Sequence, residues 1–110
     1  MSLRMRKYKW ELKLIARCRP ETRKLLFEWA TSEFIQSIVD VARAVLEGNL
    51  PLVKYDKIKI ARNSDVLQKI TDQNQTVMYK RRLLITKKGE SAVLDLLHVA
   101  NKYFAIPNRI

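Results

Sequence analysis

The sequence is poor in the residues that build crosslinks, metal sites and flexible loops. Its 110 residues include one cysteine, one histidine, two glycines and three prolines. Cys18 has no partner for a disulfide within the chain, and Cys18 with His98 is too small a set for a structural zinc site. Neither glycine belongs to a phosphate-binding loop, because each stands where a helix is expected to end. We therefore expect no metal and no cofactor.

Long apolar runs are also missing. No stretch approaches the roughly 18–20 apolar residues of a membrane span, and no apolar secretory segment follows Met1. Candidates for catalysis are few: His98 shares the polar side of a predicted helix with Asp95 and Lys102, and no nucleophile stands near it. We expect a protein that is not secreted, is not embedded in a membrane, is not an enzyme and takes no small-molecule substrate.

Positive charge is what the chain has in excess. Lys and Arg number 22 against 11 Asp and Glu, which gives a net charge of +11, while 47% of the residues are apolar and can supply a folded core. Residues 1–24 carry a net charge of +7, residues 25–53 carry −3, residues 54–89 carry +7, and residues 90–110 are neutral. We expect one domain over the whole chain, in which two basic segments flank an acidic apolar hub and an amphipathic helix follows at residues 90–104.

Apolar residues recur at helical spacing, and strand alternation is hard to find. The pattern predicts an all-α fold, a compact single-domain bundle of six to seven short helices. The predicted helices cover residues 4–18, 21–30, 32–47, 54–62, 64–72, 77–87 and 90–104. The third helix begins at a Thr31 or Ser32 cap and ends at Gly48-Asn49, a left-handed C-cap signal, whereas Thr76 and Gly89 are expected to bound the sixth. Three aromatic residues are expected in the core: Phe27, Trp29 and Phe34.

Four cations align on the first predicted helix. At 100° per residue, Arg6, Lys9, Lys13 and Arg17 fall within about 80° of one another and form a ridge about three turns long. Like charges lined up in this way repel one another, so stability gives no reason for the ridge. A polyanion converts the repulsion into attraction through release of its counterions. A solvated lysine-rich face is the alternative interpretation.

Two further basic clusters lie at residues 80–88 and at residues 54–62. Lys59 belongs to the second cluster but is not among the predicted contacts given below. The cations of the first cluster scatter around their helix, which favours contact with a phosphate backbone over readout of base edges. A nuclear-localisation signal is the alternative for that cluster. Together with the ridge, the clusters give twelve predicted nucleic-acid contacts: Arg6, Lys9, Lys13, Arg17, Lys54, Lys57, Arg62, Lys80, Arg81, Arg82, Lys87 and Lys88.

The last predicted helix is apolar over more than half of its circumference. Such a helix is either buried in the core or covered by a partner. Burial in the core is the first interpretation. Contact with a second copy or with a capsid protein is the second, and Val93, Leu97 and Phe104 are its candidate residues.

Three short motifs of the chain resemble a known family. Residues 45–52 (VLEGNLPL) resemble the VLxGNxxL segment of small basic proteins encoded by Maverick/Polinton-type DNA transposons and related adintovirus-like double-stranded DNA viruses. Residues 76–89, with their KRRLL core and KKG end, are similar to the KKKKLLxxKG stretch of those proteins, and residues 19–24 are similar to their KPKLRK helix start. After Gly89 the chain departs from the family, with a charge-balanced helix in place of an apolar GFLPALL tail. The resemblance implies a DNA-associated protein in a virion or in the nucleus of a host cell, and it implies no chemistry.

Charge and resemblance together predict a non-enzymatic protein that binds double-stranded DNA without sequence preference and packages or organises viral or transposon DNA through phosphate contacts. Charge alone does not rank DNA above RNA or an anionic membrane; the resemblance favours DNA. The rival hypothesis is a protein–protein interaction or virion assembly module that uses the C-terminal apolar helix to bind a second copy or an acidic partner.

Overall fold

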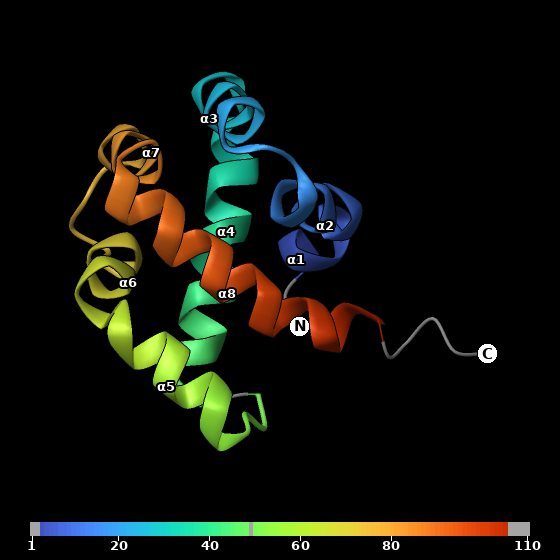
Figure 1. Cartoon of the computed structure of the whole chain (residues 1–110). Coiled ribbons are helices and arrows are strands. Elements are labelled where there is room, and N and C mark those ends of the chain that lie inside the picture. The colour runs from blue at the N-terminus through green and yellow to red at the C-terminus, as the bar shows by residue number, and fades with distance from the viewer. Residues whose placement is uncertain (1–2, 49, 106–110) are drawn as a thin grey trace.

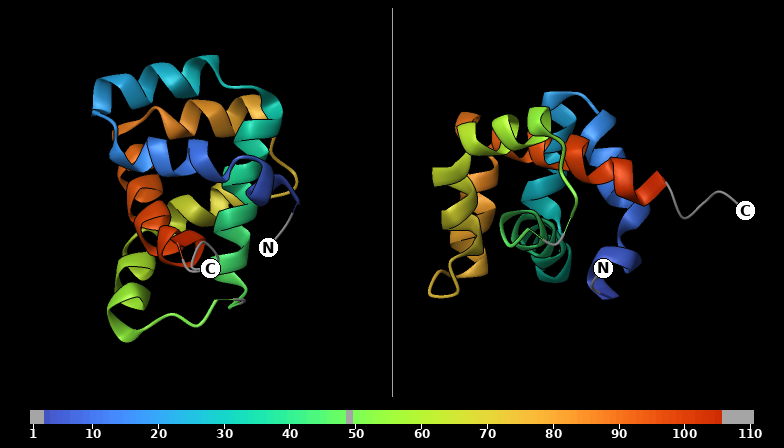
Figure 2. Two further views of the ribbon diagram at one scale, coloured as in Figure 1. Left: turned by 90° about the vertical axis from the view of Figure 1, so that its right-hand side faces the viewer. Right: turned by 90° about the horizontal axis from the view of Figure 1, so that it is seen from below.

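The computed structural model describes residues 3–48 and 50–105, with side chains as far as Lys102. Within these residues the chain forms eight helices and no strand, so the all-α prediction is confirmed, with one helix more than predicted (Figure 1). They pack into a body with a radius of gyration of 12.9 Å (Figure 2). In chain order the helices are α1 (Leu3–Lys7), α2 (Lys9–Arg17), α3 (Pro20–Trp29), α4 (Ser32–Leu46), α5 (Lys54–Arg62), α6 (Ser64–Thr71), α7 (Val77–Leu84) and α8 (Lys87–Ala105).

Helix α4 is the central element and contacts α1, α6, α7 and α8. It begins at the Thr31 cap, whose hydroxyl oxygen accepts a hydrogen bond of 3.1 Å from the N–H of Phe34. It is followed by Gly48 with a φ of 75°, the left-handed conformation predicted there. Both ends are fixed by neighbouring residues, and for that reason the sequence predicts them well.

The core lies between α4 and α8, which cross in the middle of the molecule (Figure 1). The fully buried side chains of the two helices include Ile35, Ile38, Val39, Ala42, Ala92, Val93, Leu96 and Leu97. Phe27 and Phe34 are buried as predicted, whereas Trp29 is 84% exposed, and its placement in the core is wrong. Helix α3 turns Phe27 inward, so the side chain two residues later points to the opposite side.

The prediction that Val93 and Leu97 form a partner surface is therefore wrong. Both side chains are fully buried, because α8 packs its apolar side against α4. Val93 and Leu97 belong to the core, as the first interpretation of this helix predicts. The side chain of Phe104, the third candidate, lies outside the described residues.

The first predicted helix is broken at Tyr8 into α1 and α2. Helix α1 is held on α4 by the Arg4 guanidinium, which donates to both carboxylate oxygens of Asp40 at 2.9 and 3.0 Å. The Tyr8 hydroxyl donates to Glu33 at 2.7 Å. Helix α2 packs instead against α8, so the chain turns at Tyr8 to satisfy both partners.

The sixth predicted helix ends earlier than expected, and Gly89 is not its cap. Helix α7 begins at the predicted Thr76 cap and stops at Leu84, and Thr86 accepts a hydrogen bond of 3.0 Å from the N–H of Gly89 at the start of α8. A Cβ atom on Gly89 would lie 1.7 Å from the carbonyl oxygen of Leu83. The glycine is therefore required by the close approach of α7 and α8, which the sequence does not reveal.

Candidate nucleic-acid interface

The outward side of α8 forms the middle of the candidate interface. Helix α2 contacts α8 on one flank and α5 contacts it on the other (Figure 1). Because the apolar side of α8 faces α4, positions three to four residues apart on the opposite side form one solvent-facing strip. The exposed residues of this strip are Lys87, Lys88, Ser91, His98 and Lys102.

The cations of α5 meet those of α8. Arg62 and Lys88, which are far apart in sequence, line one hollow of about 190 Å³ together with Asn63 and Ser91. Lys59 lies on the same helix, with its Nζ atom 5.3 Å from the centre of the Tyr55 ring. The structure thus brings members of two predicted basic clusters together.

Two acidic residues near this strip are paired, whereas a third, Asp65, is exposed in the hollow of Arg62 and Lys88. Asp56 is buried and accepts a hydrogen bond of 2.7 Å from Lys102. Asp95 accepts one of 2.9 Å from the amide of Asn63 and lies 3.7 Å from Arg62. These pairs neutralise the two carboxylates, so they leave the remaining cations of the strip uncompensated.

The flank formed by α2 keeps three of the four predicted ridge cations. Lys9, Lys13 and Arg17 recur at intervals of four residues, as a helix face requires. The Nζ atoms of Lys9 and Lys13 lie 5.5 and 4.6 Å from the centre of the Trp10 ring, which is 66% exposed. Arg6 lies on α1, beyond the turn at Tyr8, and leaves the ridge.

We call eight of the cations on these three helices the basic face. Its members are Lys9, Lys13 and Arg17 of α2, Lys59 and Arg62 of α5, and Lys87, Lys88 and Lys102 of α8. Lys59 and Lys102 are the members that are not among the twelve predicted contacts. Lys59 is assigned to the basic cluster at residues 54–62, whereas Lys102 is missed. The signal for Lys102 is helical spacing, because Lys102 shares the polar side of the last predicted helix with Asp95 and His98.

The fold excludes one predicted contact and partly occupies a second. Lys80 is only 3% exposed, and burial lowers the pKa of its ammonium group, with repulsion by Arg43 as the second cause. The guanidinium of Arg81 donates to the carbonyl oxygens of Phe27 and Ala30 at the end of α3. The prediction of phosphate contact is wrong for Lys80, because it is buried, whereas half-buried Arg81 has one guanidinium nitrogen bound to α3 and its contact with phosphate stays a prediction.

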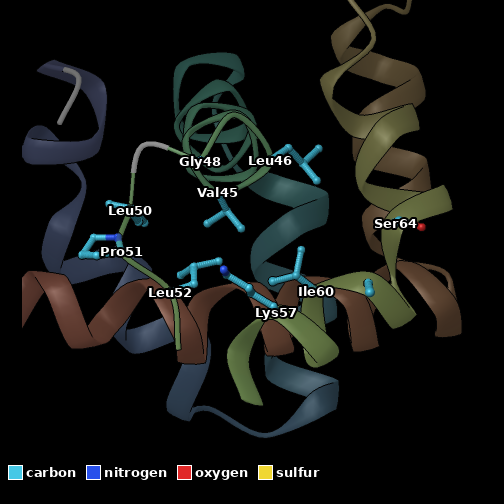
Figure 3. Close-up of a pocket in the computed structure, with 10 residues that line it drawn as sticks. Val45, Leu46, Gly48, Leu50, Pro51, Leu52, Lys57, Ile60 and Ser64 are labelled. Atoms are coloured by element: carbon cyan, nitrogen blue, oxygen red, sulfur yellow. The ribbon is translucent and has the colours of Figure 1, made fainter. Parts of the chain in front are cut away.

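Other predicted cations are exposed but lie away from the basic face. Arg6 belongs to α1 and Arg82 to α7, where its guanidinium contacts the sulfur of Met78 at 3.7 Å. Lys54 begins α5, and Lys57 lines a different hollow (Figure 3). The hollow of Arg62 and Lys88 and the ring contact of Lys59 include none of these four side chains.

The hollow that contains Lys57 has a volume of about 390 Å³ and lies between the end of α4, the following connection and α5. Val45, Leu52 and Ile60 point toward one another within it (Figure 3). Its lining is apolar apart from Lys57 and Ser64. It offers no cluster of polar groups for chemistry.

Buried Arg23 is a structural residue that the sequence prediction missed. Its guanidinium donates to the carbonyl oxygens of Ile15 and Cys18 at 2.8 and 2.6 Å and to the carboxylate of Glu90 at 2.9 Å. The end of α2 and the start of α8 are thereby fixed to α3. Nothing in the local sequence distinguishes Arg23 from its exposed neighbours.

Among the described residues, no group of three or more His, Cys, Asp or Glu side chains is placed to hold a metal ion. None of the helices in residues 3–48 and 50–105 has the length and apolar character needed to cross a membrane. Comparison with known proteins yields no match to a family model, to a curated protein or to a solved structure.

Proposed function

We propose that the protein binds double-stranded DNA through its phosphates, without reading the base sequence, and thereby packages or organises DNA. The basic face is the contact surface. It joins cations from three helices and from both basic segments of a chain with a net charge of +11. The proposed location, which rests on the family resemblance, is a virion or the nucleus of a host cell.

The pairing of the acidic residues is the observation that carries the proposal. Asp56 and Asp95, the acidic residues of α5 and α8 described beside the strip, are each held by partners within the fold. A phosphate backbone that lies along α8 therefore meets Lys and Arg side chains beside two carboxylates that are already held, and Asp65, which is exposed in the hollow of Arg62 and Lys88, is the carboxylate that it must avoid. Neutralised phosphates release condensed counterions, and this release supplies the binding free energy.

The composition of the basic face favours contact with phosphates over readout of bases. Direct readout uses Arg, Asn or Gln side chains presented together to a groove. The Asn63 amide is occupied, because it donates to Asp95 and to the carbonyl oxygen of Lys59. Of the two Arg residues of the face, Arg62 lies 3.7 Å from Asp95, and the flexible Lys side chains, which are the majority, act as point charges toward phosphate.

Salt dependence tests this proposal. If six to eight phosphates are neutralised, a log–log plot of the DNA association constant against salt concentration has a slope of about −5 to −7. Fluorescence anisotropy with two labelled duplexes of unrelated sequence measures the slope, and both duplexes should bind equally well. A slope near zero, or a large difference in affinity between the two duplexes, contradicts the proposal.

A further inference from the structure

Helix α3 has a second apolar stripe on the side that faces away from the fold. Its inner side buries Arg23 and Phe27. Its outer side carries Thr22, Leu25, Leu26 and Trp29, at the i, i+3, i+4, i+7 spacing of a helix face that is normally covered. All four side chains are exposed, and Figure 2 shows that α3 lies at the edge of the molecule.

A groove extends this stripe toward α2. It has a volume of about 300 Å³ and is lined by Leu14 together with Leu26 and Trp29, with buried Ile15 and Phe34 behind them. Leu14 and Leu25 are each 57% exposed. Several large apolar side chains gathered at one surface mark a site of protein contact, unlike single exposed ones.

The charge of this surface differs from that of the basic face. The exposed ionisable residues of α3 are Glu21, Lys24 and Glu28, and Glu11 lines the groove. The stripe therefore offers no cationic cluster to a polyanion. Two copies of a chain with a net charge of +11 repel one another wherever cations face cations, and they can approach closely at a surface of this kind.

The stripe is also complementary to itself. A two-fold axis that passes between Leu25 and Leu26 pairs two α3 helices in antiparallel orientation. Each Leu25 then lies opposite Leu26 of the other copy, and Trp29, the largest side chain of the stripe, lies opposite Thr22, the smallest. This is the arrangement of a symmetric contact, in which the same patch serves both copies.

We infer that the outer stripe of α3, with Leu14 beside it, is the contact between two copies of this chain. The pair presents two basic faces, so one dimer can hold two DNA segments. The rival hypothesis of an assembly module thus places self-association on α3 instead of the buried C-terminal helix. The inference does not depend on DNA binding, because the dimer is measured without DNA.

Sedimentation equilibrium of the full chain over a concentration series, up to about 0.5 mM, tests the inference. We expect a monomer–dimer equilibrium, and Trp29→Ser should raise the dimer dissociation constant by at least about tenfold. Ile58→Ser, which removes an exposed apolar side chain of α5, is the control and should leave the dissociation constant unchanged. A protein that stays monomeric, or an oligomer that Trp29→Ser leaves intact, overturns the inference.

A charge-swap pair tests the symmetry directly. In the two-fold arrangement Leu25→Glu places Glu opposite Leu, and Leu26→Lys places Lys opposite Leu, so each variant alone should be monomeric. An equimolar mixture brings the introduced Glu and Lys together across the axis and should restore the dimer. Circular dichroism checks that both variants are folded. If the folded variants do not combine, the antiparallel contact is wrong.

Fluorescence gives an independent readout. Trp10→Phe leaves Trp29 as the single tryptophan of the chain. As the protein concentration rises, its emission should shift to shorter wavelength in step with the dimer fraction, because the indole leaves water. A dimer that forms without this shift places the contact elsewhere and overturns the inference.

Discussion

The guanidinium of Arg23 lies 2.9 Å from the carboxylate of Glu90, a residue 67 positions later in the chain. The same group donates to two carbonyl oxygens at the end of α2. A single buried side chain therefore joins α2, α3 and α8, and these contacts hold the α2 flank of the basic face against α8.

Replacement of Arg23 should destabilise the whole fold. Arg23→Met leaves the carboxylate of Glu90 without its partner and removes the guanidinium donor from two carbonyl oxygens, so the free energy of unfolding should fall by about 3–5 kcal/mol. Lys24→Met, at the exposed neighbouring position, is the control and should change it by less than about 0.5 kcal/mol. Urea denaturation followed by circular dichroism measures both. Equal losses in the two variants would contradict the structural role of Arg23.

The two glycines should respond differently to asparagine. Gly48 has a positive φ with open space around it, so Gly48→Asn should cost about 1 kcal/mol or less. At Gly89 any Cβ atom collides with the Leu83 carbonyl, so Gly89→Asn should cost about 3 kcal/mol or more. Thermal denaturation compares the two variants. If Gly89 ended the preceding helix, as the sequence predicts, in the left-handed conformation that Gly48 adopts, asparagine would be tolerated equally at both positions.

Cations of the basic face should contribute more to the salt dependence of DNA binding than cations elsewhere. Replacement of Arg17, Lys59 and Lys88 by alanine removes three contacts and should reduce the magnitude of the log–log salt slope by about 2.7. The matched triple variant replaces Arg6, Lys54 and Arg82, which lie off the face, and removes the same charge. A slope that falls equally in the two variants would show that net charge, and not the face, governs binding.

The stability contribution of Lys80 should depend on pH. Burial lowers the pKa of Lys80 below its ordinary value of 10.5, with Arg43 adding to the shift and Asp72 opposing it. Because the unfolded chain holds this proton more tightly than the folded one, protonated Lys80 costs stability at neutral pH, and the cost disappears as the pH rises toward 10.5.

Lys80→Met should therefore raise the free energy of unfolding at pH 7 by about 1 kcal/mol, and the gain should shrink as the pH approaches 10.5. Urea denaturation at pH 7 and pH 10 measures it. Lys69→Met, at an exposed position of α6, is the control and should show no such trend. If the free energy gained by Lys80→Met is the same at both pH values, the charge of Lys80 does not destabilise the fold.

Local signals explain which parts of the fold the sequence predicts. The caps at Thr31 and Thr76 and the left-handed Gly48 depend on residues within a few positions, and all three are correct. The turn at Tyr8 depends on Asp40 and Glu33, which belong to another helix. Single-sequence spacing contains no information about such partners, so it extends the helix through the turn.

The candidate interface also has a part that local sequence predicts and a part that depends on tertiary packing. Helical spacing correctly aligns Lys9, Lys13 and Arg17, since that alignment lies within one helix. Which cations of the second basic segment are available depends on tertiary packing. Lys80 and Arg81 are adjacent to Arg82 in sequence, yet one is buried and the next is bound to the end of α3.

The bond from Arg81 to the end of α3 has a consequence for the order in which the chain folds. Helix α2 is closed by Arg23, which follows it directly, whereas the last carbonyl groups of α3 receive their donor from a residue 51 to 54 positions later. During synthesis from the N-terminus, Arg23 can bind the end of α2 as soon as α3 emerges from the ribosome, while the end of α3 lacks its Arg81 donor until α7 has been made and has docked.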